Sequence, residues 1–456
     1  MAALPLWAAT AAEMTRRFAT GEATPEQALE AVLERVETVN GRLNAVVTLD
    51  PDGARAAAAA ATARWRAGQA LGALDGVPLT VKDNLFVGGL RATWGSRLFA
   101  EHVAPRDDLP VQRLREAGTV ILGKTNTPEL ALSGHTDNLV FGSTGNPWNS
   151  DLSPGGSSGG AAAAVGSGCG PLAIATDAGG SIRRPASHAG VAGLKPGIGR
   201  VPRRYGFPPL AHDLQVVGPM ARCVSDLRAA FGLMATPASR PPAPASLRIA
   251  FFGRIGDAPV EPAMTGAFEH GCAVLRGMGH RLEEIAPPWD VEEVNRLFGA
   301  LASTGVARVV SQFPSWRDLV TPAIAQQAEA GLARSGVEYA RDLEAISAFR
   351  WRMADVLASF DIIATPAAAA LAWPRSDAFP KLIGGEEAGP RGAAIFSTAV
   401  NLAGLPAIVV PGRTGPGGLP AALQLIGGMG AEELLLDAAE AFEAASRWPR
   451  IAPDPG

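Results

Sequence analysis

Short apolar runs typical of buried strands alternate with helical segments along most of this chain. The strand-like runs are GVPLTV, TVILG, GPLAIAT, LRIAFF, FDIIATP and LPAIVVP. Among the helical segments are LPVQRLREAG, AAAAVGSG and AEELLLDAAEAFEAA, and helices are expected to fill residues 290–360. Such alternation is typical of α/β proteins, in which helices cover a sheet that contains parallel strands. We therefore predict the α/β class, with a central mixed sheet of many strands flanked by helices.

Helices are also expected in the N-terminal part of the chain (1–70). Thr24 is followed by Pro25 and, three positions after Thr24, by Gln27. This order predicts a helix that begins at Pro25, with Thr24 as its N-cap and Gln27 as the capping-box partner. The Ala-rich segment ARAAAAAATARWRA favours a second helix. The best linker candidate, 237–246, is short and strands resume after it, so we predict a single large domain.

The composition excludes several classes of function. The chain has 456 residues, of which 47% are hydrophobic and 18% charged, and its net charge is −4. This apolar content argues against disorder, and no basic run of the kind that binds nucleic acid is present. The three cysteines are widely spaced, which fits neither a disulfide framework nor a zinc cluster. Because no HExxH or CxxC motif occurs, we expect no metal and no cofactor.

The apolar segments do not predict a membrane protein. No basic residue precedes the N-terminal stretch AALPLWAATAA, so a signal peptide is not expected. Runs such as IIATPAAAALAW at 362–373 are too short, and too interrupted by proline, to span a bilayer. We expect a cytoplasmic protein with no membrane partner.

Serines occur twice in glycine-rich clusters, in GGSSGG at 155–160 and in TDAGGSIRRPA at 176–186. The first cluster literally matches the GxSxG nucleophile elbow, but no hydrophobic strand precedes it and no downstream histidine has a convincing context. A Walker-type phosphate loop is also excluded, because no GK[ST] follows the glycines. If one of these serines is a nucleophile, a lysine is the next candidate for its base.

Lys82 directly follows the apolar run GVPLTV and is well placed to be such a base. A free lysine amine has a pKa near ~10.4 and is almost fully protonated at neutral pH. Burial without a counter-charge lowers that pKa by up to ~3–5 pH units, which leaves the amine neutral. On this stretch alone, a solvated lysine beside Asp83 remains the simpler interpretation.

Five stretches taken together change that balance: KDN at 82–84, GKTNTPE at 123–129, FGSTGNPWN at 141–149, PGGSSGG at 154–160 and TDAGGSIRRPA at 176–186. In this order and spacing they resemble the amidase signature family. The resemblance runs from about residue 70 to 230 and continues more weakly at GPMARCVSDL, FDIIATP, NLAGLPAIVVP and LQLIGG. It implies the amidase signature fold, with one amidase domain over 1–456 divided into N-terminal helices (1–70), a signature core (70–230), a variable, mostly helical region that shapes the substrate pocket (240–395) and a C-terminal return to the sheet (396–456).

The resemblance also implies a catalytic set of three residues. Ser181, in GGSIR, matches the serine that becomes acylated. Ser157 lies 24 positions earlier (181 − 157) and matches a serine that bridges protons. Lys82 matches the general base that acts through that bridge. In the family, the peptide that corresponds to Gly156–Ser157 is cis.

The second serine cluster is expected to provide an oxyanion hole. Amide cleavage passes through a tetrahedral oxyanion, which needs donors aimed at the developing charge. By resemblance, these donors are the backbone N–H groups of Ala178, Gly179, Gly180 and Ser181. Small residues at these positions let the main chain approach the substrate carbonyl closely.

Five residues around this set are expected to support it. By resemblance, the carbonyl of Ala131 and the side chain of Ser133 hold the leaving amine, although Ser133 also fits an ordinary serine at a helix end. Ser158 fits either a brace for Lys82 or the cap of the helix that follows it. Asp177 and Arg183 are expected to pin the loop to the neighbouring backbone rather than touch substrate.

Arg184, His188 and three aromatic residues have two open interpretations each. Arg184 fits either a contact with an anionic substrate, as in some relatives, or a structural salt bridge. His188 stands where many relatives have an aromatic residue, and it either alters the pocket or fills space. Trp94, Tyr205 and Phe207 either line a pocket or pack elsewhere.

These expectations favour an amidohydrolase that cleaves a carboxylic amide through a Ser181 acyl-enzyme and releases ammonia or an amine. The alternative is the glutaminase subunit of a glutamyl-tRNA amidotransferase complex, in which the same site makes ammonia for a partner protein. Such subunits commonly carry an aromatic–Cys pair where this chain has Ser187 and His188, which favours the hydrolase. A catalytically inactive binding protein is disfavoured because the catalytic set is intact. The expected partner is a small-molecule amide, and a homodimer is the assembly considered; the sequence does not identify the amide.

Overall fold

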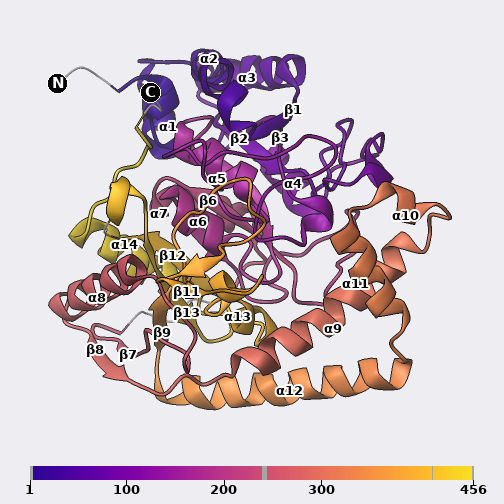
Figure 1. Ribbon diagram of the computed structural model, residues 1–456. Helices are drawn as coiled ribbons and strands as arrows, with labels where there is room; N and C mark the ends of the chain where they lie inside the picture. The colour runs from indigo at the N-terminus through magenta and orange to yellow at the C-terminus, as the bar shows by residue number, and fades with distance from the viewer. Residues whose placement is uncertain (1–3, 239–243, 413, 454–456) are drawn as a thin grey trace.

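The computed structural model describes residues 4–238, 244–412 and 414–453. Its main sheet consists of β1 (Val46–Leu49), β2 (Pro78–Lys82), β3 (Val120–Thr125), β4 (Leu172–Asp177), β5 (Ala192–Lys195), β6 (Val216–Ala221), β7 (Arg248–Phe251), β8 (Arg281–Glu284), β9 (Ile362–Pro366), β12 (Ala407–Pro411) and β13 (Ala422–Gly427). These eleven strands follow the order β1-β3-β2-β4-β6-β5-β12-β13-β9-β7-β8, with helices around them (Figure 1). A separate small pair consists of β10 (Leu382–Ile383) and β11 (Glu386–Glu387). The predicted α/β class and mixed sheet are confirmed.

Strand β2 lies between two parallel neighbours. It pairs with β3 and β4, so that Val81 lies opposite Lys124 on one side and Ile174 on the other. The three strands therefore end at the same edge of the sheet, where Lys82 ends β2 and Asp177 ends β4. In open α/β sheets, ligands bind outside the carboxyl ends of such strands. This edge is consequently the first place to look for a site.

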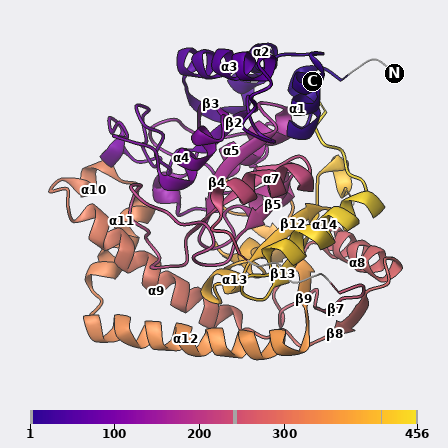
Figure 2. The same ribbon diagram turned by 180° about the vertical axis from the view of Figure 1, so that it is seen from behind.

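The N-terminal helices lie against the end of the sheet that carries β1 and β3 (Figures 1 and 2). They are α1 (Ala11–Thr20), α2 (Pro25–Leu43) and α3 (Pro51–Arg66). The hydroxyl of Thr24 accepts the N–H of Gln27, and the Gln27 side chain accepts the N–H of Thr24. The predicted capping box is therefore confirmed, and the Ala-rich segment forms α3, as predicted.

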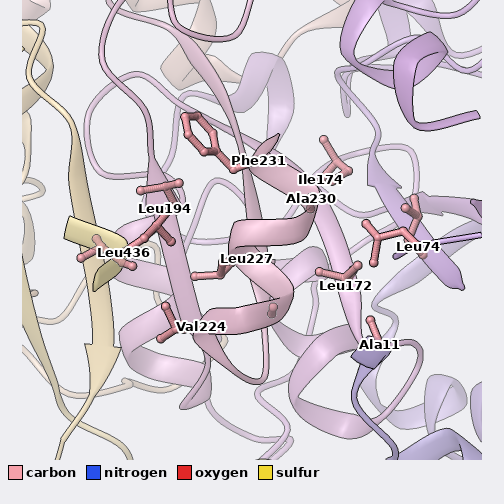
Figure 3. Packing of buried hydrophobic residues seen from close by; sticks show 14 of the residues in the cluster. Ala11, Leu74, Leu172, Ile174, Leu194, Val224, Leu227, Ala230, Phe231 and Leu436 are labelled. Carbon is pink, nitrogen blue, oxygen red and sulfur yellow. The ribbon is translucent and has the colours of Figure 1, made fainter. Parts of the chain in front are cut away.

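One face of the sheet packs against α7 (Val224–Met234) and α14 (Glu432–Ala445). Leu172 and Ile174 of β4 point into this layer, where Figure 3 shows them near residues of α7. All of these side chains belong to the largest hydrophobic cluster of the molecule. Burial of this apolar area, at roughly 25 cal/mol per Å², is the main stabilising contribution of the layer.

The opposite face carries α5 (Gly159–Ser167) and α6 (Arg183–Ala189), which pack on small side chains such as Ala173. Every residue of α5 is buried, and none is larger than valine. A Cβ at Gly160 would lie only 2.4 Å from the backbone nitrogen of Asn126. The glycines after the paired serines therefore let α5 lie directly against the neighbouring backbone.

Long helices from the second half of the chain form an edge of the molecule. They are α9 (Val291–Val310), α11 (Pro322–Leu332) and α12 (Gly336–Ser359). In Figures 1 and 2, α9 and α12 run along the lower part of the molecule in orange tones, and α11 lies above them at the side. With the short α10 (Trp316–Leu319), they fill most of 290–360, as predicted. The remaining helices are α4 (Leu109–Glu116), α8 (Pro262–Gly277) and α13 (Thr398–Leu402).

Residues 239–243 of the linker candidate lie outside the described residues. Within the ranges that are described, no helix combines the length and the apolar character needed to cross a lipid bilayer.

Candidate active site

Lys82 lies at the carboxyl end of β2 and is completely buried. Its Nζ lies 2.8 Å from Ser157 Oγ, 2.9 Å from Ser158 Oγ and 3.1 Å from Thr176 Oγ1. All three partners are neutral hydroxyl groups. In the described part of the chain, no carboxylate forms an ion pair with Lys82. The amine is therefore held by hydrogen bonds alone.

Burial lowers the pKa of Lys82 well below the 10.5 of a free lysine side chain. The charge of Asp177 raises this pKa and that of Arg203 lowers it further, but burial has the largest effect. An ammonium without a counter-ion is costly in a low-dielectric interior, so the neutral form is favoured. A neutral amine has a lone pair that accepts a proton from a neighbouring hydroxyl.

Ser157 and Ser158 stand directly before α5. The peptide bond between Gly156 and Ser157 is cis, as the resemblance implied. Ser158 occupies the N-cap position of α5, yet its hydroxyl makes no capping hydrogen bond. It instead donates to the carbonyl of Thr176 at 3.1 Å and accepts from Lys82. The geometry of Ser158 is that of a brace for the amine.

Ser181 lies in the loop between β4 and α6. Its hydroxyl makes no hydrogen bond in the described part of the chain, and the residue is 8% exposed and lines a pocket. Its carbonyl accepts the N–H of Ser158 at 3.1 Å, which joins the two serine-containing loops. Ser157 lines the same pocket, although no hydrogen bond links its hydroxyl to that of Ser181. The hydroxyl of Ser181 is thus free to meet a ligand.

The loop before Ser181 carries free backbone donors. Among the described residues, the N–H groups of Ala178, Gly179 and Ser181 make no hydrogen bond. The N–H of Gly180 differs, because it donates to Asp177 Oδ1 at 2.7 Å. This bond occupies the N–H of Gly180, so three of the four expected oxyanion donors are free in this structure, and their role stays a prediction.

Asp177 and Arg183 hold this loop from behind. Both are fully buried, and two hydrogen bonds of 3.0 and 3.1 Å join the guanidinium to the carboxylate. Asp177 also accepts the N–H of Ile182 at 2.9 Å. Burial alone raises the pKa of Asp177, but the charges of Arg183 and Lys195 outweigh it, so this pKa lies far below its usual range. Neither Asp177 nor Arg183 lines the pocket, so their contacts are those of a support for the loop.

A pocket of about 460 Å³ opens over the two serine-containing loops. It is lined by those loops, by the segment around Ala131, and by residues from the second half of the chain such as Phe298 and Arg391. A cavity of this size suits a small-molecule ligand. In the described ranges, no group of three or more His, Cys, Asp or Glu side chains is placed to hold a metal ion.

Comparison with known proteins identifies the family. The Amidase family model matches residues 27–436. The chain belongs to the amidase family. A glutamyl-tRNA(Gln) amidotransferase subunit of Moorella thermoacetica is 34% identical, with 99% of this chain and 100% of that protein covered. The indoleacetamide hydrolase of Bradyrhizobium diazoefficiens is also 34% identical, with 96% of this chain and 87% of that protein covered.

A solved structure extends the likeness to three dimensions. A bacterial aryl acylamidase of the amidase signature family superimposes with a TM-score of 0.90 at 27% identity, and the match covers 98% of both chains. This chain is therefore an amidase-family enzyme with the amidase signature fold.

In this amidase, Ala131 and Ser133 both line the pocket. Leu130 and Ala131 have φ values of 51° and 58°, a left-handed conformation that is uncommon for residues other than glycine. The hydroxyl of Ser133 accepts the N–H of His135 at 3.1 Å. These contacts place both residues at the pocket wall, and their role toward a leaving amine stays a prediction.

Several residues considered for the pocket of this amidase lie elsewhere. Trp94 and Phe207 stack with their ring centroids 4.7 Å apart in a buried hydrophobic cluster, and Tyr205 is exposed. His188 is buried, with Nε2 3.0 Å from the carbonyl oxygen of Ala370. Burial lowers the pKa of His188 to about 4. None of these four residues lines the pocket, so the interpretation as packing applies to them.

Sequence reasoning missed other residues of the site. Thr176 contacts Lys82 and also accepts a hydrogen bond from Asn84 Nδ2 at 2.9 Å. Its place at the end of the strand-like run GPLAIAT was the sequence signal that could have found it. Residues at the carboxyl ends of adjacent parallel strands lie at one edge of a sheet. Phe298 and Arg391 come from segments without a motif, and no sequence signal marks them.

Proposed function

We propose that this amidase hydrolyses a small carboxylic amide through an acyl-enzyme on Ser181 and releases ammonia or an amine. The observation that carries the proposal is the environment of Lys82. Its fully buried amine lies 2.8 Å from Ser157 Oγ, at the wall of the pocket that Ser181 lines. An amine kept neutral by burial is a base for a serine nucleophile that requires no histidine.

In the acylation step, Lys82 is the base and Ser157 the proton bridge. Ser157 gives its hydroxyl proton to Lys82 Nζ and receives the proton of Ser181, whose oxygen bonds to the amide carbonyl carbon. The π electrons of the carbonyl move onto its oxygen, which becomes the oxyanion. The hydroxyls of Ser157 and Ser181 must come within hydrogen-bond distance when substrate is bound; catalytic hydrogen bonds often tighten only in the complex.

The three free N–H groups before and at Ser181 are the proposed donors to the oxyanion: those of Ala178, Gly179 and Ser181. One such donor contributes roughly 3 kcal/mol in the transition state. Ser397 Oγ and Thr398 Oγ1 donate to the carbonyl of Gly179 at 3.1 and 3.3 Å. These two bonds fix the carbonyl of Gly179, so the start of α13 helps to hold the loop that carries the proposed donors.

Collapse of the intermediate completes the first half of the reaction. The oxyanion electrons re-form the carbonyl, the C–N bond breaks, and its electron pair goes to nitrogen. Protonated Lys82 returns its proton through Ser157 to that nitrogen, so the amine leaves neutral. Water then attacks the ester: its proton passes through Ser157 to Lys82, and its oxygen bonds to the acyl carbon. The carbonyl re-forms, the C–O bond to Ser181 breaks with its electron pair going to the serine oxygen, and Lys82 returns the proton through Ser157 to that oxygen.

The second candidate is the glutaminase subunit of an amidotransferase, because the amidotransferase subunit of Moorella thermoacetica matches nearly the whole chain. That candidate requires glutamine as the substrate and a partner protein. The hydrolase requires neither glutamine nor a partner protein. Assembly of this chain into a homodimer stays a prediction. The two candidates therefore differ in what the isolated chain hydrolyses.

The test is to purify the chain alone and measure turnover of short aliphatic, aryl and indole-type amides and of glutamine. Turnover of simple amides by the isolated chain, with loss of at least about a thousandfold in Ser181→Ala, supports the hydrolase. Ser347→Ala, on the exposed side of α12, is the matched control and keeps wild-type activity. Near wild-type turnover by Ser181→Ala would show that the nucleophile is another residue. Activity that appears only with glutamine and a partner protein would favour the second candidate.

A further inference from the structure

The pocket beside Ser181 is positively charged. Among the described residues that line it, the charged ones are Arg184 and Arg391, and none is an aspartate or a glutamate. Neither arginine forms an ion pair in the described part of the chain. The structural salt bridge considered for Arg184 is therefore absent there. Two cations without a counter-ion in one small cavity are costly unless a ligand supplies the negative charge.

Arg184 is buried with most of its hydrogen-bonding capacity unused. It is 9% exposed, and its one hydrogen bond is a long contact of 3.4 Å from Nη2 to the carbonyl of Gly156. Its Nε is buried without a partner. A guanidinium has five N–H donors, and buried donors in native proteins are nearly always satisfied. The free donors of Arg184 are therefore available to a ligand.

Arg184 lies close to the reacting groups. A Cβ added to Gly180 would lie 2.9 Å from Arg184 Nε, and a Cβ added to Gly134 would lie 2.9 Å from Nη1. The guanidinium thus lies against the residue that directly precedes Ser181. Because Arg184 and Ser181 line one pocket, one small molecule can contact both of them.

Arg391 is held in place by neutral groups. Its Nε donates to Asn295 Oδ1 and its Nη2 to Thr398 Oγ1, both at 2.7 Å, and its Cζ lies 4.5 Å from the ring centroid of Phe298. These contacts fix the side chain without neutralising it. Burial lowers the pKa of Arg391 to about 9, and the nearby charge of Arg184 adds to this effect. Both side chains line the same pocket, so their positive charges repel each other there.

We infer that the substrate of this amidase carries a carboxylate, which Arg184 and Arg391 bind in the pocket. This inference rests on the proposed amide hydrolysis and specifies its substrate class. A carboxylate offers two oxygens in the plane that a guanidinium fork matches, and such charge-assisted pairs are short and strong. One carboxylate between the two guanidinium groups also removes their mutual repulsion.

The same charges disfavour an amino acid as the substrate. Glutamine and asparagine carry an ammonium group next to their carboxylate. In the described lining no carboxylate is present to receive that ammonium, and both arginines repel it. The favoured substrates are therefore amides with a carboxylate and no amine, such as the monoamide of a dicarboxylic acid.

Matched amides test this inference with the purified full chain. Succinamate, butyramide and asparagine share the same primary amide, but succinamate carries an added carboxylate, butyramide a methyl group, and asparagine both a carboxylate and an ammonium. We expect kcat/KM for succinamate to exceed those for butyramide and for asparagine by roughly 10- to 100-fold. N-Acetylglycine against N-ethylacetamide measures the same preference with the carboxylate on the leaving amine. The inference would be overturned if butyramide and N-ethylacetamide were turned over as fast as, or faster than, their carboxylate-bearing counterparts.

Variants connect the preference to the two arginines. In Arg184→Gln and Arg391→Gln, the ratio of kcat/KM for the preferred acid to that for its neutral counterpart should fall toward one. Arg66→Gln, an exposed arginine at the end of α3, is the matched control and keeps the wild-type ratio. An unchanged ratio in both pocket variants would overturn the inference even if a carboxylate is preferred.

A binding measurement keeps the inference separate from the proposed reaction. Succinate, titrated into Ser181→Ala by calorimetry, should bind at least about tenfold more tightly than butyramide, and Arg391→Gln in that background should remove the difference. No preference for succinate would contradict the inference regardless of turnover. Conversely, selective binding of succinate together with unchanged amide turnover by Ser181→Ala would contradict the proposed mechanism and leave the carboxylate site standing.

Discussion

Thr176 Oγ1 lies 3.1 Å from Lys82 Nζ, and the same oxygen accepts a hydrogen bond from Asn84 Nδ2 at 2.9 Å. The end of β4 therefore helps to fix the amine at the end of β2. The two strands are parallel neighbours, so this contact follows from their pairing. Lys82 is thus held by three hydroxyl groups from two structural units, one from the strand β4 and two from the turn that precedes α5.

Removal of this hydroxyl should impair the reaction more than the fold. In Thr176→Val, Lys82 and Asn84 each lose a buried acceptor, which costs about 1–3 kcal/mol. We expect kcat/KM for an amide to fall about tenfold while the protein stays folded. Thr38→Val is the matched control, because Thr38 is exposed and its hydroxyl donates only to the carbonyl of Glu34. Unchanged kcat/KM in Thr176→Val would show that α5 alone positions the amine.

The rate at which a fluorophosphonate labels Ser181 should depend on pH through Lys82. Burial lowers the pKa of this amine below the 10.5 of a free lysine. The neutral amine is the active form, so the rate falls as pH drops through the lowered pKa and levels off above it. Labelling reactions stopped at set times between pH 5 and 11 measure this profile. In Lys82→Met, labelling should be at least about a hundredfold slower and should no longer depend on pH in this way. A wild-type rate that still rises steeply near pH 10.5 would contradict a neutral Lys82 at pH 7.

The buried ion pair behind the loop should contribute strongly to stability. Asp177→Asn leaves the Arg183 guanidinium buried without its counter-ion, although Asn401 and Gln424 still contact it. We expect a loss of about 3–5 kcal/mol in the free energy of unfolding. Urea denaturation measures it.

An exposed pair provides the comparison. Glu329→Gln removes the partner of Arg317, and both of these side chains are exposed. Such a surface pair contributes at most about 1 kcal/mol. If Asp177→Asn cost no more than Glu329→Gln, the support assigned to the Asp177–Arg183 pair would be wrong.

The close packing of α5 also has a direct test. A methyl group at Gly160 would lie 2.4 Å from the backbone nitrogen of Asn126 and 2.8 Å from the carbonyl oxygen of Ala45. We expect Gly160→Ala to destabilise the protein by about 1–3 kcal/mol and to displace the serines that precede α5. In the exposed part of α7, Gly232→Ala meets no atom within 4 Å and should stabilise by roughly 0.5–1 kcal/mol. Equal melting temperatures for the two variants would contradict this account.

Features encoded within a few neighbouring residues were predictable from the sequence. Two such features are the capping box of Thr24 and Gln27 and the strand that ends at Lys82. Both depend on residues that lie within a few positions of one another in the sequence. The grouping of Lys82, Ser157 and Ser181 also came from the sequence, through the resemblance of short ordered motifs. Their roles in catalysis stay a prediction.

The tertiary structure alone decided which groups compensate one another. Gly180 was expected among the oxyanion donors, but the folded loop turns its N–H toward Asp177. Arg391 lies 210 positions after Ser181 (391 − 181) and lines the same pocket. Hydrogen bonding and charge compensation depend on distances in space, which no local pattern records. The sequence therefore determined the elements and the reactive residue types, whereas the fold decided which donors stay free and which charges stay unpaired.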